Sequence, residues 1–250
     1  MRTRNARPKT IEMDAVLAAS YQRSMRRCRK ERYVSLSRVT SMTPEAARVL
    51  LDWDNGFMDL DGFTELPGDV AEVLGEFPGS LLFNSLNFLT DEAAAGLAEH
   101  VGYLSLNGLP MISTSAARLL TSRPAPSDGQ SRGRMLRLEG LRHLDVSTAR
   151  ALANYDGELV FGHQIDLSPA VLAALAKHTG LLTLWIGALS KDRAEALARH
   201  AGDLHLFLGP LTDDAAEALA KHRGDIKIGT VWPHDCLEAN AALKKYRPDL

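Results

Sequence analysis

The dominant pattern in the chain is a block of 22 to 24 residues that recurs about eight times between Tyr33 and Gly224. Each block opens with x-L-x-L, an alternation of apolar and variable residues that is typical of a β-strand. A short turn follows, and then L-[S/T]-x-x-x-A-x-x-L-A-x-H-x-G, whose apolar residues recur at helical spacing. We therefore expect one strand and one helix per block, with blocks beginning at Tyr33, Phe57, Leu81, Tyr103, Met135, Glu158, Leu181 and Asp203.

The residues between these elements support the same boundaries. A hydroxyl side chain precedes each of six helical runs, where it can accept from free backbone N–H groups: Thr43, Thr90, Ser113, Ser168, Ser190 and Thr212. Pro44 and Pro169 follow two of these residues, at the first helical position, where proline is tolerated. Glycines follow the helices, where we expect a left-handed conformation: Gly102, Gly157, Gly180, Gly202 and Gly224.

A unit this short cannot bury its own apolar face, so it must stack on its neighbours. The clearest copies are LLTLWIGALSKDRAEALARHAG (181–202) and DLHLFLGPLTDDAAEALAKHRG (203–224). In these features the chain resembles the leucine-rich repeat family, and more closely a bacterial Ala-rich variant, over roughly residues 33–224. The asparagine that usually follows the strand leucines is mostly absent, and Gly108 and Gly140 lie near its place. The resemblance implies an α/β horseshoe-like solenoid with a parallel sheet on the concave face and helices on the convex face.

Three segments follow from this interpretation. Residues 1–32 form an N-terminal segment, residues 33–224 hold eight repeats, and residues 225–250 form a C-terminal cap with a short helix around 237–246. Repeat four carries an insertion near 121–134, rich in Pro, Gly and Ser, that should form a loop. The insertion could be a lid or a docking arm, and we favour the simpler interpretation that it has no separate role.

The pattern of apolar residues in the N-terminal segment predicts an amphipathic helix that covers the first repeat. Its apolar positions over 11–30 are spaced by three or four residues: Met13, Leu17, Tyr21, Met25 and Cys28. The opposite face is basic and could meet nucleic acid or an anionic surface: Arg23, Arg26, Arg27, Arg29 and Lys30. A third interpretation is that the chain is part of a longer protein.

Charge and cysteine content indicate which partners and which cellular compartment to expect. Residues 1–32 hold ten Lys/Arg and three Asp/Glu, and the remainder holds 19 and 28, so a segment of charge +7 precedes one of −9. This acidic remainder leads us to expect no nucleic-acid partner. The two cysteines, Cys28 and Cys236, lie near opposite ends, and such low cysteine usage suits a reducing compartment. Because Glu12 and Asp14 interrupt any apolar leader and no long apolar run exists, we expect a cytoplasmic protein without a transmembrane helix.

Alternation along each strand separates core from surface and locates a partner site. The position between the two strand leucines should face outward: Ser35, Asp59, Phe83, Ser105, Arg137, Val160, Thr183, His205 and Lys227. The position after the second leucine should also face outward, and it includes Asp61, Ser85, Glu139, Trp185 and Phe207. We expect Trp185, Phe207, His205, Thr183, Arg137 and Glu139 to bind a partner protein, because exposed aromatic patches mark interaction sites. Alternatively, the C-terminal cap, with Trp232, covers the aromatic residues.

Four histidines recur at one repeat position, His100, His178, His200 and His222, with Tyr155 in repeat five. A stack of imidazoles could bind a transition metal or respond to pH. We favour a structural role near the helix C-terminus, where a partly positive side chain suits the free carbonyls.

No nucleotide-binding, hydrolase or metalloprotease motif occurs in the sequence. We therefore expect a non-enzymatic protein-interaction scaffold that uses no cofactor or metal. Nucleic-acid or anionic-surface binding through the arginine-rich helix is the alternative, and an enzyme or metal-binding protein built on the histidines is a third possibility.

Overall fold

The structure is a computed structural model, and it describes residues 11–26, 33–53, 56–122, 134–230 and 241–247. It confirms an α/β protein in which a large parallel sheet alternates with helices. Among the described residues, nine strands form one open parallel sheet. They follow one another in chain order, with β3 passed over: β2 (Tyr33–Ser35), β4 (Phe57–Asp59), β5 (Ser80–Leu82), β6 (Tyr103–Ser105), β7 (Met135–Leu138), β8 (Glu158–Phe161), β9 (Leu182–Ile186), β10 (Leu204–Leu208) and β11 (Ile226–Thr230).

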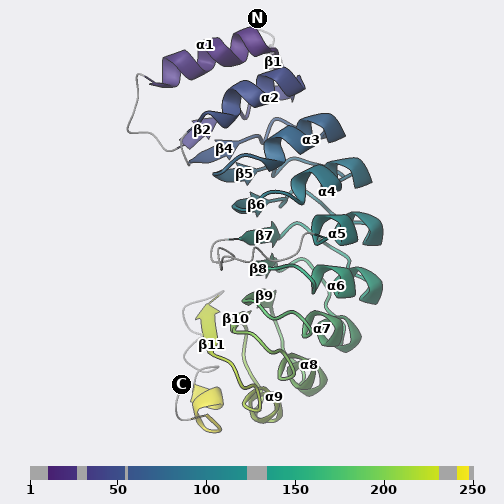
Figure 1. Cartoon of the computed structure of the whole chain (residues 1–250). Coiled ribbons are helices and arrows are strands. Elements are labelled where there is room, and N and C mark those ends of the chain that lie inside the picture. Colours follow the sequence, from purple (N-terminus) through teal and green to yellow (C-terminus); the bar gives the residue numbers. More distant parts are fainter. Residues whose placement is uncertain (1–10, 27–32, 54–55, 123–133, 231–240, 248–250) are drawn as a thin grey trace, which may run out of the picture.

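A helix follows each strand from β4 to β10, and two further helices precede them. In Figure 1 the strands form one layer and the helices the other, stacked from the N-terminal to the C-terminal end. The helices are α1 (Ala15–Arg26), α2 (Pro44–Leu51), α3 (Gly68–Gly75), α4 (Asp91–Leu97), α5 (Thr114–Leu120), α6 (Val146–Leu152), α7 (Pro169–Leu175), α8 (Lys191–Leu197) and α9 (Asp213–Leu219). A small parallel pair, β1 (Ile11–Met13) and β3 (Val39–Met42), lies beside the first repeat.

The predicted helix starts are confirmed, with one difference. Five of the six predicted hydroxyls accept a backbone N–H in the first turn, and proline lies in the first turn of α2 and of α7. Ser190 occupies the same place before α8 but makes no such hydrogen bond. Asp145, which we did not single out, accepts from Ser147 and Thr148 at the start of α6. These hydrogen bonds, chiefly the one from the Thr148 hydroxyl, hold the pKa of the Asp145 carboxyl well below its usual range.

The predicted register of the third strand is wrong by one residue. Leu81 pairs with Met58 and Leu104, so the strand begins at Ser80, and Leu82 rather than Phe83 takes the outward position. Phe83 is fully buried, and its ring meets that of Phe63 edge-to-face at 6.3 Å between centroids. The segment SLLF contains three consecutive apolar residues, so alternation alone allowed either register.

The glycines that recur before the strands have a different role from the predicted one. Of the glycines that the structure describes, only Gly157 has a positive φ, at +152°. A Cβ at Gly102 or Gly180 would instead overlap the carbonyl oxygen of the glycine one repeat earlier. The helices end five residues before these glycines, for example at Leu97 before Gly102 and at Leu175 before Gly180, and the glycines lie just ahead of the strands. Glycine is therefore required for close backbone stacking between repeats, and the predicted left-handed conformation applies to Gly157 alone.

The core runs the length of the stack between the two layers. Strand leucines on the inner face pack against alanines and leucines of the helices, such as Ala93, Ala94 and Leu97 of α4, each at most 1% exposed. Small alanines let each helix approach the next repeat closely, which explains the EALA pattern.

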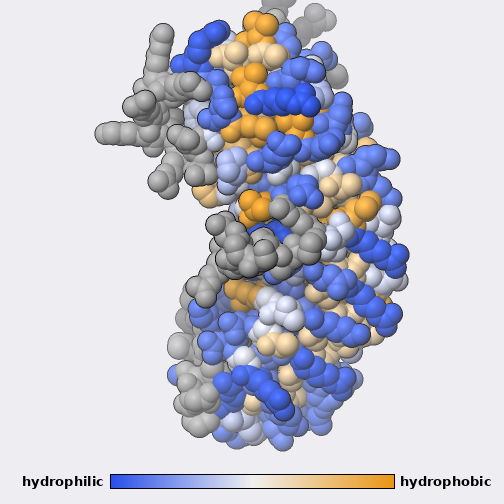
Figure 2. Space-filling model, viewed as in Figure 1, coloured by the Kyte–Doolittle hydropathy of each residue, from blue (hydrophilic) through white to orange (hydrophobic). Residues whose placement is uncertain are grey.

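The N-terminal helix differs from the predicted one. Met13 belongs to β1, and Leu17 is 40% exposed, while Ala18 and Gln22 are buried against the neighbouring repeat. Met13 is buried as predicted but lies in β1, because the helix begins only at Ala15, and the predicted apolar face is wrong for Leu17, which lies on the exposed side of α1. Figure 2 shows hydrophobic surface gathered at this N-terminal end of the molecule. Cys28 and Cys236 lie outside the described residues.

The last described segment packs on α9. Residues 241–244 are helical, Leu243 is 2% exposed, and Lys245 Nζ donates to Asp213 Oδ2 at 2.7 Å. Arg247 Nη1 donates to the carbonyl oxygens of His222 and Gly224 at 2.9 and 3.3 Å. These bonds satisfy backbone acceptors that have no following repeat to pair with.

Most of the predicted insertion lies outside the described residues. Its two ends are buried. Thr121 Oγ1 donates to the carbonyl of Ala151, at 3.1 Å, and Arg134 is 3% exposed.

Candidate functional site

In each x-L-x-L-x block the two leucine positions face the helices, and positions one, three and five lie on the opposite face of the sheet, which we call the sheet face. Parallel pairing in register aligns equivalent positions, so that Phe207 lies beside Trp185 and His205 beside Thr183. Each row of side chains therefore continues across neighbouring repeats. The sheet face therefore brings together residues from distant parts of the sequence.

The structure brings the three predicted aromatic residues into contact. The rings of Trp185 and Phe207 stack with centroids 4.2 Å apart and planes 16° from parallel. The His205 ring lies 4.6 Å from that of Phe207, at an angle of 37°. A Cβ at Gly229 would fall 2.5 Å from the Phe207 ring, so a glycine on β11 leaves room for this ring. We call Trp185, His205 and Phe207 the aromatic stack.

The aromatic stack is partly accessible. All three side chains are half-buried rather than fully exposed, so their rings can contact a partner only through part of their surface. Thr183, which we predicted to face a partner, is 5% exposed, and its hydroxyl donates to Glu158 Oε1 at 2.9 Å. Thr183 therefore lies on the sheet face but is covered and bound to Glu158, and the prediction that it is exposed is wrong.

Arg137 and Glu139 lie together further along the sheet face and bind each other. Arg137 Nη2 donates to Glu139 Oε1, and Arg137 Nη1 donates to Tyr103 Oη at 2.9 Å. The guanidinium carbon lies 5.9 Å from the centre of the Tyr103 ring, in cation–π range. Both side chains are about one-third exposed, 33% and 28%. They are accessible, although already partnered.

Sequence reasoning missed a second group of aromatic residues, at the first strand position. Tyr33 and Phe57 pair across β2 and β4 and are 48% and 45% exposed, more than any residue of the aromatic stack. The Phe57 ring meets Tyr103 edge-to-face at 6.1 Å, across the small side chain of Ser80. We call Tyr33, Phe57 and Tyr103 the N-terminal aromatic group. The alternation rule would have found it, had the first strand position been counted as outward-facing.

Two carboxylates lie beside this group. Asp59 Oδ2 accepts from Tyr33 Oη at 2.7 Å and from Ser35 Oγ at 3.0 Å, and its Oδ1 accepts from the Asp61 N–H at 3.0 Å. The hydrogen bond to Asp59 is the main reason that the pKa of Tyr33 is raised. Asp61 accepts from the backbone N–H of Asn84 at 2.7 Å and from its side-chain amide at 3.3 Å.

The same pattern continues along the turns. Asn84 Oδ1 accepts from Ser105 Oγ at 2.6 Å, and Asn107 Oδ1 accepts from the Glu139 N–H at 3.0 Å. Short polar side chains after the strands thus satisfy backbone groups of the next repeat. These hydrogen bonds connect the N-terminal turns, although most repeats lack the asparagine that we expected after the strand leucines.

The four repeated histidines are buried, and three of them stack. The rings of His178, His200 and His222 follow one another at 5.9 and 6.0 Å, and all four histidines are at most 2% exposed. Burial lowers the pKa of each, that of His100 to about 4. They lie just after the helices and are uncharged at neutral pH, so the predicted interaction of positive imidazoles with the helix dipole is wrong. No group of three or more potential metal ligands was found among the described residues.

Repeat five shows the same position with different chemistry. Tyr155 replaces the histidine, and burial raises its pKa to about 12. The guanidinium carbon of Arg134 lies 5.0 Å from the centre of the Tyr155 ring, and Arg134 immediately precedes β7, where glycine stands in most other repeats. A flat ring is thus kept at this position, which indicates packing as its role.

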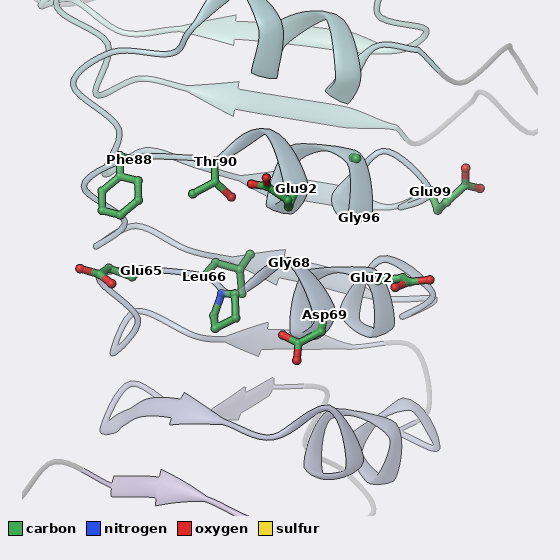
Figure 3. A pocket seen from close by; sticks show the side chains of 12 residues that line it. Glu65, Leu66, Gly68, Asp69, Glu72, Phe88, Thr90, Glu92, Gly96 and Glu99 are labelled. Atoms are coloured by element: carbon green, nitrogen blue, oxygen red, sulfur yellow. The ribbon is translucent and has the colours of Figure 1, made fainter.

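A groove lies on the opposite side of the molecule, between α3 and α4. Its volume is about 830 Å³, and Figure 3 shows Phe88 at one end and Glu99 at the other. Gly96 brings the two helices close, since a Cβ there would lie 2.5 Å from the backbone nitrogen of Glu72. The lining residues include five carboxylates, Glu65, Asp69, Glu72, Glu92 and Glu99, and no Lys, Arg or His. The groove lies on the helix side, separate from the sheet face, and combines an apolar lining with carboxylates.

The basic face predicted for the N-terminal helix is described only in part. Arg23 is exposed, and Arg26 ends α1, whereas Arg27, Arg29 and Lys30 lie outside the described residues. The alternative of an anionic partner therefore rests on the sequence.

Within the described part of the chain, no helix combines the length and the apolar character needed to cross a bilayer. No protein-family model matches the sequence, and a search of curated proteins found no significant relative.

Proposed function

We propose that this chain is a leucine-rich-repeat-like solenoid that binds a partner protein through its sheet face and performs no catalysis. The observation that carries the proposal is the stack of Trp185 and Phe207 across two neighbouring strands, with His205 against it. The order of the strands supports the solenoid, because from β4 to β11 every neighbour in the sheet is also the next strand in sequence, and only β3 is passed over between β2 and β4. The low cysteine content supports a cytoplasmic location.

The aromatic stack has the properties of an interface anchor. Trp is among the residues that contribute most to binding, especially where it is held rigidly before the partner arrives. Contact with Phe207 fixes one face of the Trp185 ring, and Gly229 leaves space for Phe207 to lie flat. Little side-chain entropy therefore remains to be lost when a partner covers these rings.

The polar groups of the sheet face support binding rather than chemistry. Asp59 and Asp61 hold turns and strands through hydrogen bonds to neutral groups, and Glu139 binds Arg137. Each therefore has a structural task in the stack, and Arg137 and Glu139 remain accessible at the rim of a partner site. Such rim charges influence the rate and specificity of association more than its strength.

The test is capture of proteins from the lysate of the native host with the whole chain. The wild type is compared with a Trp185→Ala/Phe207→Ala double variant, and Phe88→Ala, which removes an exposed ring from the helix side, is the matched control. If the stack is a hot spot, the double variant should lose about 2 kcal/mol or more of binding, roughly a thirtyfold weakening, once the captured protein is titrated.

Melting temperatures of all three proteins decide how a loss is interpreted. A folded double variant that retains the same proteins as the wild type would refute the assignment of the site. A large fall in melting temperature with unchanged capture would show that the rings serve folding. Captured nucleic acid that high salt releases would favour the arginine-rich segment instead.

A further inference from the structure

The N-terminal aromatic group offers a second recognition site on the sheet face, distinct from the aromatic stack. Tyr33 and Phe57 are the two large aromatic residues of this face that are more than two-fifths exposed among the residues described, and they are adjacent. The hydrogen bond from Tyr33 Oη to Asp59 fixes one ring, and the edge contact with Tyr103 orients the other. A partner would therefore meet two ring surfaces that are already ordered.

The charge beside these rings is negative. Asp59 is 6% exposed, so its charge acts from beneath the surface, whereas Asp61 is half-buried and can be reached. The hydrogen-bond donors to both carboxylates within the described chain are neutral: two hydroxyls, two backbone N–H groups and a side-chain amide. Aromatic faces and a carboxylate that meets only neutral donors among the described residues together attract a cation.

An arginine bound by a ring and a carboxylate already occurs within the chain, at the neighbouring strands β6 and β7. The Arg137 guanidinium lies over the Tyr103 ring, donates to Tyr103 Oη, and donates to the carboxylate of Glu139. Tyr33, Phe57 and Asp61 provide the same components, namely a ring with a hydroxyl, a second ring and a carboxylate. An arginine fits such a site better than a lysine, since its planar group stacks on rings and binds carboxylates with two N–H groups.

We propose that the N-terminal aromatic group, with Asp59 and Asp61, binds an arginine side chain of a partner protein. This inference deepens the proposed protein-binding function and rests on it for the source of the arginine. The geometry of the site itself is independent of the aromatic stack, because five strand steps of about 4.8 Å separate β4 from β9. A partner that engages both sites must extend roughly 24 Å along the sheet face.

The experiment titrates the full chain, labelled with ¹⁵N, with an acetylated and amidated tetra-arginine peptide. The matched probe is tetra-citrulline, which has nearly the same shape without the charge. Backbone amide signals of Tyr33, Phe57 and Asp61 should shift with tetra-arginine and not with tetra-citrulline. Phe57→Leu, which keeps an apolar side chain, should weaken tetra-arginine binding about fivefold, the equivalent of roughly 1 kcal/mol for a cation–π contact.

A second variant keeps the test valid if Phe57→Leu disturbs folding. Asp61→Asn keeps an oxygen that can accept the Asn84 N–H, and it should also weaken tetra-arginine binding severalfold. Glu92→Gln in the helix-side groove and Trp185→Ala in the aromatic stack are the control variants, and both should bind tetra-arginine as the wild type does.

The outcomes separate this inference from the proposed function. Equal shifts with both peptides, shifts confined to the helix-side groove, or unchanged binding by Phe57→Leu and Asp61→Asn would each overturn the arginine site. None of these results bears on capture through Trp185 and Phe207. Conversely, failure of that capture together with charge-dependent binding at Phe57 would leave the arginine site standing.

Discussion

Acidification should destabilise this protein through the histidines buried behind its helices, and His100 allows the effect to be calculated. His100 is 2% exposed, and burial, the largest cause, lowers its pKa from 6.5 to about 4. Its Nε2 faces the carbonyl of Tyr103 at 3.3 Å, and the positive charge of Arg134 lowers the pKa further. In the unfolded chain the same imidazole binds a proton below about pH 6.5. Stability is therefore complete above that pH and is lost as the pH falls towards 4.

The expected size follows from the two pKa values. A pH of about 5 lies some 1.5 units below the pKa of the imidazole in the unfolded chain, whereas the folded imidazole remains mostly neutral. The free energy of unfolding therefore falls by about 2 kcal/mol for His100 alone. Burial also lowers the pKa of His178, His200 and His222, and the charge of His200 adds to this at its two neighbours. These groups change stability in the same direction as His100.

The assay is guanidinium unfolding of the wild type and of His100→Gln at about pH 7.5 and about pH 5. The variant should lose about 2 kcal/mol less than the wild type between the two pH values, whatever its stability at the higher one. The same substitution at exposed His143 is the matched control. If His100→Gln and the wild type lose equal stability on acidification, the argument from burial is wrong.

Five further substitutions, two of which are matched controls, test the packing of the stack by the same unfolding assay. Gly102→Ala should destabilise by about 2 kcal/mol or more, because its Cβ would overlap a carbonyl of the preceding repeat, whereas Gly187→Ala, with nothing within 4 Å, should have little effect. Equal losses for these two would contradict the close-stacking argument. Thr90→Ala should cost about 1 kcal/mol through the lost hydrogen bond at the start of α4, and Ser190→Ala should cost less, because Ser190 makes no such bond. Leu184→Ala should cost about 3 kcal/mol, since Leu184 is fully buried, and a smaller value would indicate that the core relaxes around the cavity.

The sheet face illustrates how far alternation can predict a site. It placed Trp185, Phe207 and His205 together correctly, because parallel strands in register align equivalent positions. It gave no measure of exposure, and Thr183 is buried although its position faces outward. Exposure depends on the lengths and directions of neighbouring side chains, which periodicity does not contain.

Close approach between repeats was likewise invisible in the sequence. The glycines before the strands invite an interpretation as helix ends, yet Gly102 and Gly180 are needed where one repeat's backbone meets the next. The histidine position has the same character. Its repetition is evident in the sequence, but only the stacking of His178, His200 and His222 shows that the rings are buried and neutral.

The sequence by itself determined the repeat, the alternation of strand and helix, and the helix starts, because these depend on local periodicity and on hydroxyls within three residues of the N–H groups they accept from. Only the tertiary structure decided the register of β5, the burial of the histidines, and the gathering of Tyr33 and Phe57 beside Asp59. These features join residues more than 20 positions apart, and their energies arise from contacts between repeats. A pattern within one repeat cannot specify what the next repeat places against it.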